Sequence, residues 1–152
     1  MPRLGIALLI SVALLISAAY AGPSPFLQIT FDECANGLAW DRSAYGNLGF
    51  VSNAMLVPGV AGAGLRFSGQ NSFVRCAPLS GLGERQALTV SAWAKLDSAG
   101  LRGFPTVVRK EGAFALRFTE DRIGFVLWFG KDPVGIDGRK TEWPQDTWHH
   151  VA

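Results

Sequence analysis

The stretch Leu88-Thr89-Val90-Ser91-Ala92-Trp93-Ala94-Lys95-Leu96 decides the fold class. Apolar residues stand at every second position, and Thr, Ser, Trp and Lys fill the positions between them. A period of two is typical of a strand with one buried face, because successive side chains of a strand point to opposite sides of the sheet. The stretch therefore predicts a half-buried β-strand.

Similar runs recur on both sides of this stretch. Alternating or β-branched runs cover residues 27–32, 65–67, 73–76, 106–108 and 114–118, and residues 123–129 are apolar almost throughout, as in a strand buried on both faces. Turn formers separate these runs at Asn36-Gly37, Gly46-Asn47, Pro58-Gly59, Ser68-Gly69 and Asp137-Gly138, and residues 119–122 read as a hairpin loop. Many short strands separated by turns predict an all-β, antiparallel two-sheet sandwich.

The N-terminus has the pattern of a secretory signal peptide. Arg3 is the only charge in residues 1–21, an apolar run follows over residues 4–16, and Ala19-Tyr20-Ala21 fits the small-residue cleavage pattern. We expect residues 1–21 to be a helical signal peptide, and residues 22–152 to form a single exported domain, secreted or held in the cell envelope. The apolar run is shorter than the roughly 20 residues of a membrane-spanning helix, so we expect no stable membrane span after cleavage.

Charge and cysteine content narrow the class of protein. Without Arg3, 13 Lys and Arg face 12 Asp and Glu in a scattered arrangement, which argues against nucleic acid as a partner. Both cysteines, Cys34 and Cys76, follow residue 21. In an oxidising compartment they have one internal pairing, and the bridge would close a loop of about 43 residues, worth about 4 kcal/mol in the chain-entropy model. We expect this disulfide, and two buried free thiols are the alternative.

Five segments, in order along the chain, resemble the LamG-like jellyroll domains, which are relatives of laminin G and pentraxins in the concanavalin A-like superfamily. They are Phe31-Asp32-Glu33 with residues 40–49, the glycine-rich residues 58–69, Phe73-Val74, residues 88–95, and Asp146-Thr147-Trp148-His149-His150-Val151-Ala152. The resemblance implies a two-sheet jellyroll. In that family the last segment opens a strand that further strands follow, so the resemblance also implies that the final strands of the sandwich lie outside residues 22–152.

The carboxylates do not form a glycosidase pattern. Glycosidases need two carboxylates across one cleft, whereas Asp32-Glu33 and Glu120-Asp121 are adjacent pairs, which point to opposite faces of a strand. His149 and His150 diverge for the same reason and do not suggest a metal or catalytic pair. We therefore expect no catalytic residues and no enzyme activity.

Calcium is the cofactor that the resemblance brings into consideration, because some relatives bind it. Calcium takes carboxylate and carbonyl oxygens, often from loops, and Asp32, Asp41 and Asn47 lie in the opening segment, with Asp132 and Asp137 in a later polar stretch. We expect Asp32, Asp41 and Asn47 as candidate ligands. The alternative is ordinary turn chemistry, since Asp and Asn side chains also cap turns.

The tryptophans are candidate platforms for sugars. Trp93, Trp128 and Trp148 lie in strand patterns and are expected in the core, whereas Trp143 lies in a polar loop and is the expected ligand-binding residue; Trp40 is the fifth. These features predict a secreted, non-catalytic module that binds carbohydrate or extracellular protein surfaces. The alternatives are a structural module of a larger extracellular or envelope protein, and an accessory fragment of a carbohydrate-active enzyme.

Overall fold

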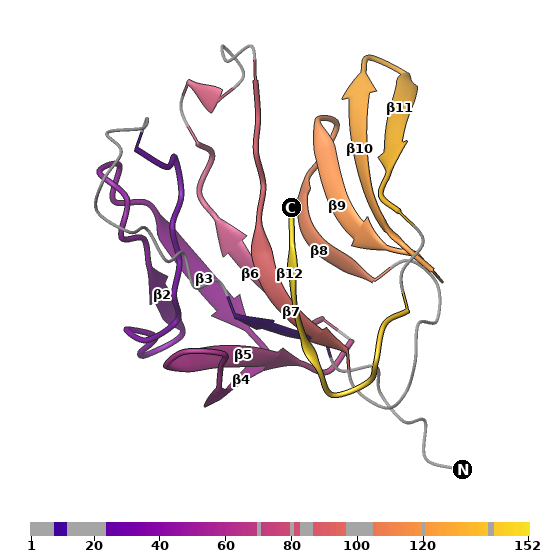
Figure 1. Cartoon of the computed structure of the whole chain (residues 1–152). Coiled ribbons are helices and arrows are strands. Elements are labelled where there is room, and N and C mark those ends of the chain that lie inside the picture. The colour runs from indigo at the N-terminus through magenta and orange to yellow at the C-terminus, as the bar shows by residue number, and fades with distance from the viewer. Residues whose placement is uncertain are drawn as a thin grey trace.

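The computed structural model describes residues 8–11, 24–69, 71–79, 81–82, 87–96, 105–119, 121–139 and 142–152, and these form antiparallel strands and turns (Figure 1). No α-helix occurs within these ranges, so no described helix is long and apolar enough to cross a membrane. The protein is thus an all-β antiparallel sandwich, as the period-two runs predict.

Within the described ranges, twelve strands form three sheets. The largest has the order β12-β7-β1-β5-β4, a second has the order β11-β10-β9-β8, and the third has the order β2-β3-β6. The strands are β1 (Leu8–Ser11), β2 (Leu38–Trp40), β3 (Leu48–Ser52), β4 (Ala54–Pro58), β5 (Ala63–Phe67), β6 (Phe73–Cys76), β7 (Ala92–Leu96), β8 (Thr106–Lys110), β9 (Phe114–Phe118), β10 (Ile123–Phe129), β11 (Asp132–Asp137) and β12 (Trp148–Val151).

The core lies where the inner faces of these sheets meet. Its central strands are β5, β7 and β9, and its largest fully buried side chains are Phe118, Leu65 and Leu116. Each such side chain contributes about 1.5–3 kcal/mol by leaving water. In β7, Ala92, Ala94 and Leu96 are buried and the residues between them are half-buried, which confirms the predicted alternation. The strand begins later than expected, since residues 87–91 are not part of it.

Two strand predictions differ from the structure. The residues between positions 27 and 32 make only an isolated bridge, between Ile29 and Asp41. β10 is not buried throughout: Gly124 and Val126 are buried, Ile123 and Phe125 are half-buried against the core, and Phe129 at its end is 67% exposed. Burial thus falls off toward the end of β10, which extends beyond the core as the strand reaches its turn into β11.

The N-terminal segment also differs from expectation. Residues 4–16 were expected as part of a helix, but Leu8–Ser11 is an extended strand between β5 and β7. A short apolar run has no period that separates helix from strand, and two neighbouring strands satisfy its backbone groups here. The rest of residues 1–21 and the expected cleavage point lie outside the described residues.

The two cysteines are free thiols, so the expected disulfide is not formed in this structure. A bridge needs Cα atoms within about 7 Å of each other. Cys76 ends β6, Cys34 leads into β2, and β3 lies between those two strands. Both side chains are half-buried and pack against the same core cluster, which is the alternative that the sequence left open.

Candidate functional site

The sheet β2-β3-β6 has one inner and one outer face, and its register assigns each residue to one of them. Paired residues of antiparallel strands share a face. Gly49 pairs with Ala39 and with Cys76, and these three positions lie toward the core, where Ala39 is fully buried. The outer face carries the residues at the alternate positions: Leu38, Trp40, Leu48, Phe50, Ser52, Phe73 and Arg75.

Three aromatic side chains form a diagonal row across this outer face. Trp40 pairs with Leu48, and Phe50 stands two residues further along β3. Phe50 pairs with Arg75, and Phe73 stands two residues from Arg75 on β6. Each step therefore joins diagonal neighbours, which lie about 7–8 Å apart. The row crosses all three strands in one straight line of roughly 15 Å.

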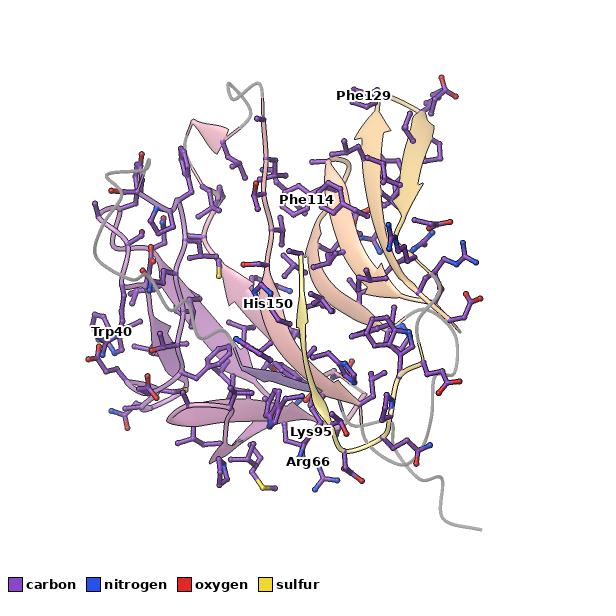
Figure 2. The ribbon with its side chains drawn as sticks, in the orientation of Figure 1. Trp40, Arg66, Lys95, Phe114, Phe129 and His150 are labelled. Atoms are coloured by element: carbon purple, nitrogen blue, oxygen red, sulfur yellow. The ribbon has the colours of Figure 1, made fainter. Side chains whose placement is uncertain are left out.

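The rings of this row are open to solvent. Trp40, Phe50 and Phe73 are 50%, 53% and 40% exposed, and Figure 2 places Trp40 on the side of its sheet that faces away from the β8–β11 sheet. The guanidinium carbon of Arg75 lies 5.1 Å from the centre of the Phe73 ring, which is a cation–π contact. We call Trp40, Phe50, Phe73 and Arg75 the aromatic row.

A loop of residues 41–47 joins β2 to β3 next to Trp40, and Asp41 organises it. The Asp41 carboxylate accepts hydrogen bonds from the backbone N–H groups of Gln28, Ser43 and Asn47, the Ser43 hydroxyl and the Asn47 side-chain amide, at 2.6–3.0 Å. Burial raises the pKa of this carboxyl, but the hydrogen bonds from Ser43, Gln28 and Asn47 together outweigh it, and the pKa lies below its usual value. The loop that borders the aromatic row is therefore fixed by one ionised side chain.

Asp32 fixes a different turn. Its Oδ1 accepts the backbone N–H of Ala63 at 2.8 Å, at the turn between β4 and β5. Gly62 of this turn has φ +73° and lies so close to Asp32 Oδ1 that a Cβ atom would collide with it, so both its backbone and its lack of a side chain are required. The Ala63 bond, with a second from Thr30 and the charge of Arg42, holds the pKa of Asp32 below its usual value despite slight burial.

These contacts give the three expected calcium ligands other roles. A carboxylate offers about four lone-pair positions, and five donors already approach Asp41. Asn47 turns its amide nitrogen toward Asp41 and toward the carbonyl of Phe26, and Asp32 serves the other turn. Among the residues that the structure describes, no group of three or more His, Cys, Asp or Glu side chains could hold a metal ion. Asp132 and Asp137, expected in a loop, are the two ends of β11.

Trp143, the expected ligand-binding residue, is half-buried instead of exposed. Its ring meets Phe118 edge-on with centroids 4.8 Å apart, and His149 edge-on at 5.1 Å. Trp143 Nε1 and His149 Nε2 are buried without a hydrogen-bond partner in this structure. Trp143 thus packs against the core. Trp40, at 50%, is the most exposed of the five tryptophans.

The two histidines diverge as predicted. His149 pairs with Ala94 and His150 with Trp93 on β7, which places them on opposite faces of the sheet. His150 is exposed and its ring lies 5.2 Å from the Trp93 ring. They share no site.

A shallow cavity of about 300 Å³ lies beside the β11-β10-β9-β8 sheet. Its walls include Leu88, Phe114, Leu127, Trp128 and Phe129, with Lys110 beside them. Binding pockets combine apolar walls with a few polar groups that converge on the ligand, and this cavity offers one ammonium group from its lining side chains. The aromatic row is therefore the stronger candidate site.

Sequence reasoning named Trp40 as a candidate platform for sugars but gave no binding role to Phe50, Phe73 or Arg75. The signal was available locally: in Phe50-Val51-Ser52 and Phe73-Val74-Arg75 an aromatic residue stands beside a β-branched one. What the sequence does not contain is the register, and only the register shows that the three rings form one line.

The comparisons with known proteins do not assign this chain to a family. No family model matches it, and no significant match was found among curated proteins or solved structures. The function therefore has to be argued from the geometry above.

Proposed function

We propose that this protein is an exported, non-catalytic module that binds an extended glycan chain along the aromatic row. The observation that carries the proposal is the straight diagonal of Trp40, Phe50 and Phe73 on an open sheet face. Flat aromatic rings pack against the apolar faces of sugar rings, and three rings in line suit a linear oligosaccharide better than a single sugar. Arg75 adds hydrogen-bond donors for hydroxyl or carboxylate groups of the glycan.

Three further features support this proposal. The N-terminal signal pattern and the resemblance to LamG-like jellyroll domains both favour an extracellular binding module. The described carboxylates near the row have structural partners: Asp32 and Asp41 hold turns, and Glu33 pairs with Arg42.

The test is a glycan array with the full chain, followed by calorimetry on the best ligand. We expect Trp40→Ala and Phe50→Ala to weaken binding about tenfold or more, as truncation of aromatic anchors does at interfaces. Phe129→Ala is the matched control, because Phe129 is an exposed aromatic on a different sheet, and it should bind like the wild type. Circular dichroism checks that each variant is folded.

Other outcomes discriminate the alternatives. Binding to an extracellular protein but to no glycan, with the same dependence on Trp40 and Phe50, would make the row a protein contact. If the row variants lower the melting temperature and no ligand of either class binds, a structural module is the better description. Equal glycan binding by all variants would refute the row as the site.

A further inference from the structure

The largest sheet depends on a strand from the N-terminal apolar segment. β1 is the central strand of the order β12-β7-β1-β5-β4, and it runs antiparallel to both neighbours. In Figure 1 it is the short indigo strand between β5 and β7. The same residues, Leu8–Ser11, lie within the segment that has the pattern of a signal peptide.

Removal of that segment would divide this sheet into β12-β7 and β5-β4. β5 and β7 carry buried core residues, including Leu65, Phe67, Ala94 and Leu96. Each strand would lose its hydrogen-bonding partner on one edge, and unpaired N–H and C=O groups of buried strands are costly. Open edges of this kind pair readily with another strand.

The register defines the chemistry of the strand that fits between them. Leu8 is in register with Phe67 and Leu96, and Ile10 with Leu65 and Ala94. All four partners are buried, so both positions call for apolar residues.

The middle position has different neighbours. Leu9 is in register with Arg66 on one side and Lys95 on the other. Arg66 is exposed, and the ammonium group of Lys95 lies 5.6 Å from the Trp148 ring centre; Figure 2 shows the two labels together below the sheet. Opposite charges on directly paired positions stabilise a sheet, so a residue flanked by two cations favours Asp or Glu.

We propose that the place between β5 and β7 is a strand-acceptor site that, once residues 1–21 are removed, takes an extended peptide segment from a partner. The segment runs antiparallel to both strands and has an apolar–acidic–apolar pattern in register with Phe67, Arg66 and Leu65. The inference rests on the predicted signal cleavage and is independent of glycan binding by the aromatic row.

The test cuts the folded full chain at a protease site inserted between Ala21 and Gly22. Size-exclusion chromatography with mass spectrometry then reports whether the fragment of residues 1–21 stays bound. Labelled peptides with the sequence of residues 6–13 compete for the site, in three versions: Leu9→Glu, Leu9→Lys and Leu9→Pro. We expect retention of the fragment, displacement by the Glu peptide at about tenfold lower concentration than by the Lys peptide, and none by the Pro peptide, which lacks a backbone donor.

Two controls keep the result interpretable. The preference for Glu over Lys should shrink in 1 M salt, because screening weakens charge pairs, and it should fall or reverse in the Lys95→Glu chain. Equal displacement by the Glu and Lys peptides would overturn the proposed pattern. Loss of the fragment with no peptide binding would overturn the acceptor site, and so would a dimer in which a second copy pairs with β5 or β7.

Discussion

At the scale of single residues, the Asp41 carboxylate fixes the loop of residues 41–47 by accepting hydrogen bonds from it. Its pKa is lowered in the folded state, so its stabilising contribution is present above the unfolded pKa of about 3.9 and is lost as pH falls through the lower folded value. We predict that Asp41→Asn lowers stability by about 3 kcal/mol at pH 7, because an amide presents an NH₂ group to donors that need an acceptor. Thermal unfolding of both proteins from pH 7 down to pH 2 measures this.

The pH profile separates the charge from the loss of packing. The difference in melting temperature between wild type and Asp41→Asn should be largest near pH 7 and should narrow below about pH 4. Asp132→Asn is the control, because Asp132 is an exposed carboxylate at the start of β11, and its variant should follow the wild-type curve. A difference for Asp41→Asn that stays constant across this range would contradict the role of the ionised carboxylate.

At the scale of elements, two strand glycines have opposite surroundings. A Cβ atom on Gly49 of β3 would lie 2.8 Å from Val74 Cγ1 and 3.4 Å from the Ala39 carbonyl oxygen, whereas one on Gly135 of β11 would meet nothing within 4 Å. We predict that Gly49→Ala destabilises the protein by about 1–3 kcal/mol through overpacking. Gly135→Ala should leave stability unchanged or raise it by up to about 1 kcal/mol by restricting the unfolded chain.

Urea unfolding of the two alanine variants measures this pair. Because both glycines are strand residues without positive φ, intrinsic backbone preference is similar and the difference reports packing. Equal stability of the two variants would show that the inner face of β2-β3-β6 is not closely packed, and the assignment of its outer face would lose its support.

The elements differ in how far the sequence predicts them. β5, β7 and β9 contain buried residues and lie in stretches where apolar residues alternate with other residues. This alternation is enough to identify them as strands from the sequence. β2, β3 and β4 lie between residues typical of turns and show no clear alternation of apolar and polar residues, so their strand character comes from pairing and not from local pattern. β1 was assigned to a signal helix because an apolar run carries no period, and its extended form depends on β5 and β7, which are more than 50 residues away in the chain.

At the scale of the whole molecule, the candidate site was less predictable than the fold. Fold class follows from composition and periodicity, which are local. The aromatic row depends on the registers of two strand pairs, and Trp143 was expected outside because nothing near it in the sequence reveals that Phe118 packs against it. Sites made by register or by distant packing require the tertiary structure.

The state of the two thiols tests the whole fold, because Cys34 and Cys76 bring distant parts of the chain to one core. Burial raises the pKa of both thiols, and for Cys76 the charge of Asp41 raises it further. A raised pKa leaves less reactive thiolate at neutral pH. We predict that a thiol-specific reagent modifies the native protein at least about tenfold more slowly than the denatured protein, and that denaturation without reductant yields two thiols per chain. The variants Cys34→Ser and Cys76→Ser should each yield one. No reactive thiol after denaturation would mean that the protein carries the disulfide, and that the segment leading into β2 lies closer to the end of β6 than this structure places it.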